Sequence, residues 1–164
     1  MLIILGGLPG SGKTTLARAL ARRIGALHLR IDTIEQTLAS AAVLKDDLGP
    51  AGYLVGYALA EDNLRLGATV IADSVNSSGI TREGWRAVAA RAGVAAFEIE
   101  VRCFDPAVHR ARVETRTADI PGHHLPRWQD VVARGWEPWS PDLVVDTAAR
   151  SVEAAVDAVM ARLG

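Results

Sequence analysis

The chain has 164 residues, of which 49% are hydrophobic and 23% are charged, and its formal net charge is −1 at pH 7. This composition excludes a disordered chain, and the charge gives no general attraction to nucleic acid or to an anionic membrane. No apolar run approaches the ~20 residues that span a bilayer, and the first run meets glycine too early for a signal peptide. We therefore expect one cytoplasmic domain over residues 1–164, with no membrane partner.

The predicted elements alternate between strands and helices along the chain. Continuous apolar runs are typical of strands covered on both faces, and apolar residues repeated every three or four positions indicate helices. The strands are predicted at Leu2–Leu5, Ala26–Ile31, Thr69–Ala72, Phe97–Cys103 and Leu143–Val145. The helices are predicted at Lys13–Ile24, Thr33–Ala42, Ala51–Leu66, Thr81–Ala92, Pro106–Thr117, Trp128–Gly135 and Val152–Leu163. This order predicts a parallel sheet between helical layers, with ligands at the carboxyl ends of the strands.

Between the first strand and the first helix lies a loop with the spacing of a triphosphate-binding motif. It reads Gly7-Leu8-Pro9-Gly10-Ser11-Gly12-Lys13-Thr14. Its glycines let the backbone curl until N–H groups face phosphate oxygens, and the following helix adds its positive N-terminal end. Lys13 is expected at the β- and γ-phosphates and Thr14 at Mg²⁺. The motif, together with Thr15, therefore predicts binding of a nucleoside triphosphate, which we expect to be ATP with Mg²⁺.

Aspartates stand at or just after the carboxyl ends of three predicted strands. Asp73 ends a β-branched strand, so we assign it to the Mg²⁺ shell, with a helix or turn cap as the alternative. Asp32 is the candidate general base, because a kinase needs a carboxylate within hydrogen-bond reach of the attacking hydroxyl. The alternative for Asp32, a cap for the helix beginning at Thr33, does not exclude that role. Asp105 is interpreted as the cap of the helix that begins at Pro106.

Two arginines four residues apart, Arg112 and Arg116, are expected to share one face of a predicted helix. The segment after Thr117 contains proline and glycine, which predicts a loop and places a lid at about residues 112–127. A lid guanidinium would stabilise the negative charge that spreads over a transferred phosphoryl group. The alternative is a solvated arginine face that pairs with Glu114 and other acids.

These residues make the chain resemble the P-loop kinases that include polynucleotide 5′-hydroxyl kinases, zeta-toxin kinases, chloramphenicol phosphotransferase and gluconate kinases. The blocks that carry the resemblance are residues 7–14, Arg30-Ile31-Asp32, Val70-Ile71-Ala72-Asp73-Ser74 with Asn76, Arg82 and Trp85, and the pair Arg112 and Arg116. The resemblance covers roughly residues 2 to 135 and implies an α/β three-layer fold with a five-stranded parallel sheet and a helical lid. It also implies that Asp32 is the general base and that Asp73 and Ser74 face the acceptor or the metal. Arg116 would contact the transferred phosphate.

One position departs from the polynucleotide kinases, which have an arginine three residues beyond the base to hold an acceptor phosphate. This chain has Glu35 there, and a carboxylate repels phosphate. The chain also has no basic stripe, so nucleic acid is not expected as a partner. Glu35 is predicted either to accept hydrogen bonds from hydroxyls or an amine of a small molecule, or to be an exposed residue of the first helical turn.

The acceptor pocket is expected between the helix after Asp32 and the segment Gly79–Trp85, which contains Arg82. Tyr53 and Tyr57 lie four residues apart and are predicted either to line this pocket or to pack in the core. The tryptophans between the lid and the last strand either seal the lid base or form an aromatic wall for a ligand; they are Trp128, Trp136 and Trp139. In related kinases the adenine borders the loop after the fifth strand, here residues 146–150.

The sequence therefore predicts an ATP-dependent kinase that phosphorylates a hydroxyl group of a small molecule. Two alternatives stay open at this point. One is a kinase of nucleic-acid or nucleoside 5′-hydroxyl groups, and the other is a nucleotide-dependent regulatory ATPase.

Overall fold

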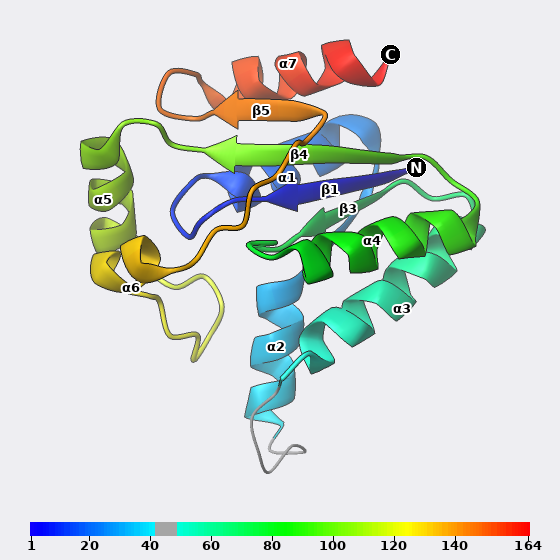
Figure 1. Cartoon of the computed structure of the whole chain (residues 1–164), viewed down its shortest axis with the longest axis horizontal. Coiled ribbons are helices and arrows are strands. Elements are labelled where there is room, and N and C mark those ends of the chain that lie inside the picture. The colour runs from blue at the N-terminus through cyan, green and yellow to red at the C-terminus, as the bar shows by residue number, and fades with distance from the viewer. Residues whose placement is uncertain (42–48) are drawn as a thin grey trace.

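A computed structural model describes residues 1–41 and 49–164 and contains one parallel sheet (Figure 1). Its strands are β1 (Leu2–Gly6), β2 (Leu27–Arg30), β3 (Val70–Asp73), β4 (Ala96–Arg102) and β5 (Leu143–Asp146), in the order β2-β3-β1-β4-β5. The helices of the described residues are α1 (Lys13–Ile24), α2 (Ile31–Ser40), α3 (Ala51–Arg65), α4 (Gly79–Ala92), α5 (Pro106–Thr115), α6 (Trp128–Ala133) and α7 (Val152–Leu163). The predicted five-stranded α/β fold is confirmed, with element ends displaced by a few residues at most.

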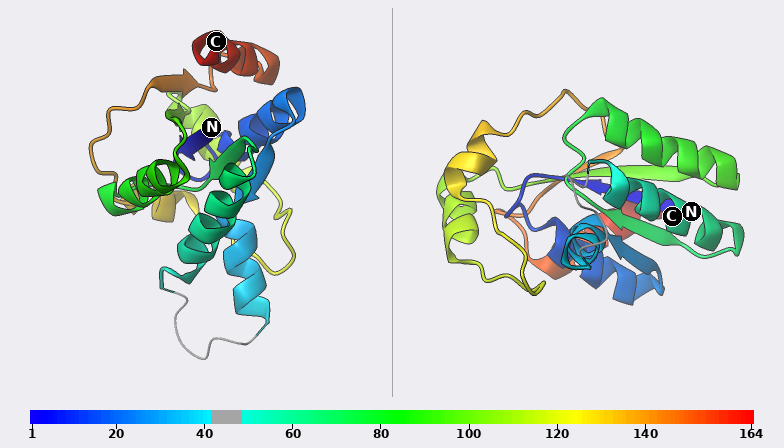
Figure 2. Two further views of the ribbon diagram at one scale, coloured as in Figure 1. Left: turned by 90° about the vertical axis from the view of Figure 1, so that its right-hand side faces the viewer. Right: turned by 90° about the horizontal axis from the view of Figure 1, so that it is seen from below.

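Two hydrophobic cores lie on opposite faces of the sheet, each beneath helices that cover that face (Figure 2). Ile3 and Leu5 of β1 pack toward α1 and α7, whereas Leu2 and Ile4 pack toward α3 and α4. All four side chains are fully buried. The uninterrupted apolar run of β1 therefore reflects a strand covered on both faces, since successive side chains point to opposite sides.

The strand register brings the candidate site residues to one edge of the sheet. Leu5 of β1 pairs with Asp73 at the end of β3, and Asp73 also pairs with Arg30 at the end of β2. Gly6, the last residue of β1, pairs with Glu100 of β4. The loop after β1 consequently begins between the ends of β3 and β4, while the lid helices α5 and α6 lie beyond the same edge (Figure 1).

The second helix begins earlier than the sequence predicts. The chain passes from β2 directly into α2, which starts at Ile31 with Arg30 as the N-cap residue and no side-chain cap. Asp32 is thus inside the first helical turn, and the interpretation of Asp32 as a helix cap is wrong. The predicted end of this helix, Ala42, lies outside the described residues.

The capping role expected of Asp105 is confirmed. Its Oδ1 accepts hydrogen bonds from the backbone N–H groups of Ala107 at 2.9 Å and Val108 at 3.1 Å. These bonds satisfy N–H groups that have no partner within the first turn of a helix, so they fix the residue at which α5 begins.

Among the residues that the structure describes, no helix has the length and apolar character needed to cross a membrane.

Candidate active site

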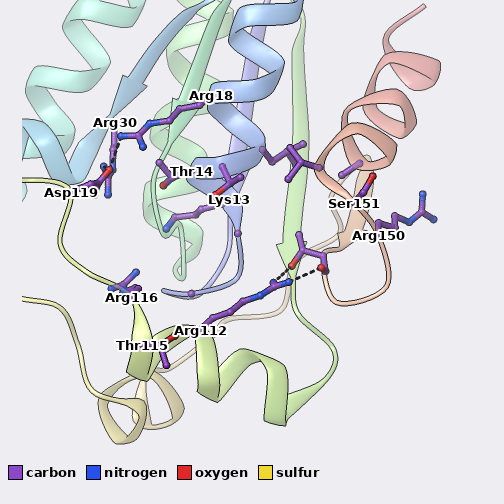
Figure 3. Close-up of a pocket in the computed structure, with 17 residues that line it drawn as sticks. Lys13, Thr14, Arg18, Arg30, Arg112, Thr115, Arg116, Asp119, Arg150 and Ser151 are labelled. Atoms are coloured by element: carbon purple, nitrogen blue, oxygen red, sulfur yellow. Dashed lines mark hydrogen bonds and ion pairs between the residues drawn. The ribbon is translucent and has the colours of Figure 1, made fainter.

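The loop between β1 and α1 presents its backbone to the cavity that contains the candidate site (Figure 3). Gly10 and Gly12 have φ angles of 81° and 93°, a region that disfavours side chains. A Cβ on Gly10 would also lie only 2.5 Å from the side chain of Val113 on α5. Gly12 is the N-cap residue of α1, and Lys13 opens the helix. This arrangement joins a curled backbone to a helix N-terminus, which is the geometry that binds phosphate.

Asp73 is a buried carboxylate next to the phosphate-binding loop, with 1% of its surface exposed. Burial alone would raise its pKa, but a hydrogen bond with His28, the positive charge of Lys13 and the Thr14 hydroxyl together hold the pKa below its ordinary value. His28 Nε2 lies 3.0 Å from Asp73 Oδ2. The carboxylate is therefore ionised, and it lies beside the hydroxyl expected to bind Mg²⁺. Oxygen donors of this kind are the ligands that Mg²⁺ prefers, so the pair fits the ion.

The nucleotide end of the cavity is organised by Thr147, in the loop after β5. Its hydroxyl donates to the carbonyl oxygen of Ser11 in the phosphate-binding loop at 2.7 Å and lies 3.1 Å from that of Arg102. Arg112 donates to both the hydroxyl and the carbonyl oxygen of Thr147, at 2.8 and 3.0 Å. One threonine thus connects the loop, the end of β4 and the lid helix α5.

The two lid arginines line the same cavity and make different contacts. Helix α5 ends at Thr115, and Arg116 is its C-cap residue, with φ −68°, ψ 146° and a backbone N–H that donates to the carbonyl oxygen of Arg112. Arg112 is directed to Thr147, whereas Arg116 lies on the side of the cavity near Arg30 (Figure 3).

Arg116 lies within electrostatic range of the candidate base. Burial lowers the pKa of Arg116, the charges of Asp32 and Asp119 oppose that shift, and the charge of Arg30 adds to it. Arg30 is close to both carboxylates, with Nη2 3.7 Å from Asp32 Oδ2. Arg30 and Arg116 line the cavity of about 510 Å³ that also contains Lys13, whereas Asp32 lies beside it, behind Arg30.

A second acidic residue, Glu35, lies one helical turn beyond Asp32. Burial raises the pKa of Glu35, repulsion by Asp32 raises it further, and the charge of Arg134 lowers it in part. Burial also raises the pKa of Tyr53, whose hydroxyl lies beside Ser74 and the backbone of Asn76 and within range of both acids. Ser74 is 1% exposed. The structure thus gathers Asp32, Glu35, Tyr53 and Ser74 on one side of the phosphate-binding loop.

Tyr57 packs in the core and does not join this group. Its hydroxyl donates to the carbonyl oxygen of Thr81 at 3.0 Å, and its ring meets Trp85 edge-on with centroids 4.6 Å apart. Burial and the neighbouring Tyr53 raise the pKa of Tyr57 to about 12. Both tyrosine rings pack against the core on this face of the sheet, and of the two hydroxyl groups that of Tyr53 lies near Asp32, Glu35 and Ser74.

Arg82 has a structural role in place of the acceptor contact that the sequence predicts. It is 2% exposed, and its Nε donates to the carbonyl oxygen of Ser78 at 3.0 Å. Its terminal nitrogens donate to the carbonyl oxygens of Glu137 and Pro138 at 3.3 Å. The guanidinium also lies 5.2 Å from the ring centroid of Trp139. These hydrogen bonds hold the segment at Glu137 and Pro138, between α6 and β5, against α4. The N–H groups of Arg82 are therefore used in contacts within the fold.

Trp139 and Trp128 pack between the lid and the core, whereas Trp136 lines a separate cavity beside the phosphate-binding loop. Trp139 Nε1 donates to Glu98 Oε2 at 3.1 Å, and its ring covers Gly6 at the end of β1. Trp128 meets His109 edge-on with centroids 5.2 Å apart, and His109 Nε2 lies 2.8 Å from the carbonyl oxygen of Pro9.

Three site residues escaped the sequence reasoning, namely His28, Arg18 and Asp119, whereas Thr147 belongs to the loop expected beside the adenine. Arg18 Nη2 and Arg30 Nη1 lie 2.7 and 2.8 Å from the same oxygen of Asp119. Parallel pairing of β2 with β3 gave a weak signal for His28, since both strands end at one edge. Nothing in the local pattern indicated Arg18 or Asp119. The described residues contain no group of three or more histidine, cysteine, aspartate or glutamate side chains that could hold a metal ion.

Comparisons with known proteins place this geometry in a family. A sequence model of the AAA domain family matches residues 2–134, while curated proteins give no match. A protein of Chloroflexus aurantiacus described as a candidate kinase is 25% identical, with a TM-score of 0.78 over 99% of this chain and 98% of that one. An APS kinase of Mycobacterium tuberculosis, solved with AMPPNP and APS, is 19% identical, with a TM-score of 0.68 and coverage of 99% and 96%. A gluconokinase of Sinorhizobium meliloti is 20% identical, with a TM-score of 0.67 and coverage of 98% and 90%. The chain therefore belongs to the AAA domain family and has the fold of the P-loop nucleotide-dependent kinases.

Proposed function

We propose that the protein is an ATP-dependent, Mg²⁺-requiring kinase that transfers the γ-phosphoryl group to a hydroxyl of a small molecule. The observation that carries the proposal is that Lys13 and Arg116 line one cavity, with Asp32 beside it at 3.7 Å from the lining residue Arg30. A phosphoryl group leaving the loop at Lys13 would pass between a cation that stabilises it and a carboxylate that activates its acceptor. The kinase structures with the same fold support this assignment.

In the mechanism we propose, the amides of residues 7–14 and Lys13 hold the triphosphate. Thr14 and Asp73 would hold Mg²⁺, which neutralises phosphate charge when it is bound. Asp32 orients the acceptor hydroxyl and takes its proton as the new oxygen–phosphorus bond forms and the bond to the β-phosphate oxygen breaks. The products are ADP and a phosphate monoester. Arg116 stabilises the charge on the group in transfer.

The acceptor side favours a polyhydroxy or amino compound over a phosphorylated one. Asp32, Glu35 and Tyr53 offer oxygen atoms that accept hydrogen bonds, and a phosphate would have to approach two carboxylates. Arg134 provides a positive charge near Glu35, and that charge is partly balanced by the acid beside it. We therefore place sugars, polyols, amino alcohols and nucleosides ahead of nucleic acid as acceptors.

The proposal is tested with γ-labelled ATP, Mg²⁺ and panels of sugars, polyols, amino alcohols, nucleosides and 5′-hydroxyl oligonucleotides. Asp32→Asn keeps the shape of the side chain and loses the base, so kcat on the best acceptor should fall about 10²- to 10⁴-fold. ADP affinity should stay within about threefold, because Asp32 is not among the cavity-lining residues.

Lys13→Met is the paired variant, and it should weaken ADP binding by about 100-fold through loss of charge-assisted bonds. If Asp32→Asn leaves all turnover unchanged while Lys13→Met abolishes binding, the protein is a regulatory ATPase. Transfer to oligonucleotides alone would instead identify a nucleic-acid kinase.

A further inference from the structure

One carboxylate of the lid is held by two arginines of the core. Asp119, in the loop after α5, receives Arg18 Nη2 at 2.7 Å and Arg30 Nη1 at 2.8 Å on the same oxygen, Oδ2 (Figure 3). Arg18 lies on α1, one helical turn after Thr14, and Arg30 is the last residue of β2. The lid is thereby joined both to the helix that begins at the phosphate-binding loop and to the strand that precedes Asp32.

Asp119 is close enough in sequence to Arg116 to limit where that arginine lies. Asp119 lies three positions after Arg116 along the chain, a span of at most about 11 Å when extended. Arg116 is the C-cap residue of α5: its backbone N–H still donates to the carbonyl oxygen of Arg112, and the chain leaves the helix directly after it. Its Nε is buried and has no hydrogen-bond partner among the residues that the structure describes. The position of Arg116 therefore depends on the chain on either side of it, with α5 on one side and the anchored Asp119 on the other.

The charges around Arg116 also indicate that Asp119 helps to hold it in place. Arg116 and Arg30 line one cavity, where their like charges repel each other. Asp119, three positions after Arg116, places a negative charge beside Arg30 and so offsets this repulsion. Hydrogen bonds from Arg30 and Arg18 lower the pKa of Asp119 to about 2, so the carboxylate is ionised at neutral pH. The contact to Arg30 is the more shielded of the two, because the Arg30 side chain is 12% exposed and that of Arg18 is 47% exposed.

We propose that Asp119 is a positioning residue for phosphoryl transfer, which latches the lid to Arg18 and Arg30 and so delivers Arg116 to the transferred group. This inference rests on the proposed kinase function for its effect on turnover. The latch itself is a contact of the nucleotide-free protein and is measured without any turnover. Asp119 lines the cavity that also contains Lys13, but its carboxylate is held by Arg18 and Arg30, and in this scheme it acts through Arg116.

The first measurement is hydrogen exchange of the lid amides at residues 117–125 in the nucleotide-free protein. Asp119→Asn removes the charge and keeps the shape, so exchange should become about tenfold faster, as expected for loss of two ion pairs of this exposure. Arg18→Gln, which removes only the exposed partner, should give a smaller acceleration and serves if Asp119→Asn folds poorly. Salt at 0.5 M should raise the exchange rate of the wild-type lid toward the rates of the variants, since it screens exposed charges. Glu114→Gln is the matched control, because its ion pair with Arg110 lies within α5 and joins nothing to the core.

The second measurement separates kcat from KM on the best acceptor. Asp119→Asn should lower kcat about tenfold and leave the KM for ATP within about twofold, and Asp119→Glu should recover most of the loss. Unchanged lid exchange in Asp119→Asn overturns the latch, and faster exchange with unchanged kcat overturns the positioning role. If no acceptor is phosphorylated by the wild type, the kinase proposal fails, while the exchange data still decide the latch.

Discussion

The nucleotide side and the lid side of the cavity are built in different ways. On the nucleotide side, backbone groups and one hydroxyl carry the structure: positive-φ glycines shape the loop, and Thr147 bonds the carbonyl oxygens of Ser11 and Arg102. On the lid side, charged side chains meet across loops, as in the contacts of Asp119 with Arg18 and Arg30. Hydrogen bonds between packed neutral groups are little affected by salt, whereas exposed ion pairs are screened.

The two kinds of contact suit two different tasks, holding a triphosphate and moving a lid. A triphosphate has the same shape in every turnover, and a rigid backbone suits it. In the kinase we propose, the lid would have to open for exchange of nucleotide and acceptor, and contacts of low individual stability would allow it to do so. The variants below are chosen to break one side while the other is left intact.

The largest effect is expected on the lid side, from Arg116→Ala. Loss of the guanidinium should lower kcat about 10³-fold, because an arginine that stabilises a phosphoryl group in transfer contributes that much or more. The KM for ATP should change less than about threefold, since Thr147 and the loop amides stay in place. Steady-state kinetics provides the measurement, with Arg110→Ala on the exposed face of α5 as the control. A loss of ATP affinity as large as the loss of kcat would mean that Arg116 holds the nucleotide itself.

A smaller effect, on the nucleotide side, is expected from Thr147→Val. Valine keeps the volume of threonine but removes the hydroxyl that serves Ser11, Arg102 and Arg112, which should cost about 1–3 kcal/mol. We expect ADP to bind about tenfold more weakly in calorimetric titration, with kcat at saturating ATP reduced less than twofold. Thr37→Val is the control, because that hydroxyl bonds only within α2. A fall in kcat at saturation, with ADP affinity intact, would contradict the division between the two sides.

The smallest effect is expected from Glu35→Gln, on the acceptor side. The folded-state pKa of Glu35 is raised, first by burial and then by Asp32. The folding stability linked to its protonation is therefore present below its ordinary pKa and is lost as pH rises through the raised value. Glutamine does not titrate, so the melting temperature of Glu35→Gln relative to the wild type should increase between pH 4 and pH 7. The gain should be below about 1 kcal/mol for a half-buried group. Glu153→Gln, at an exposed position of α7, provides the comparison, and a difference that does not change with pH would contradict the assigned pKa direction.

The fold was predictable because its signals are local. The apolar run of β1, the spacing of residues 7–14 and the proline after Asp105 each report on adjacent positions, and parallel pairing then places the strand ends together. The missed contacts join residues far apart in the sequence: 45 positions for His28 and Asp73, 101 for Arg18 and Asp119, and 136 for Thr147 and Ser11. No periodicity records such pairs. The structural contacts of Arg82 were missed for the same reason, since the carbonyl groups of Glu137 and Pro138 lie more than 50 positions away from it.

The direct passage from β2 into α2 has a consequence for how acceptors would be chosen. Asp32 lies in the first turn of a helix whose preceding residue is still part of the sheet, so no hinge separates it from the rigid centre of the molecule. In the kinase we propose, the carboxylate would stay still and every acceptor would have to bring its hydroxyl to that fixed point. A change of substrate would then require reshaping the walls contributed by α2 and α3, because the base itself has no freedom to follow a new alcohol.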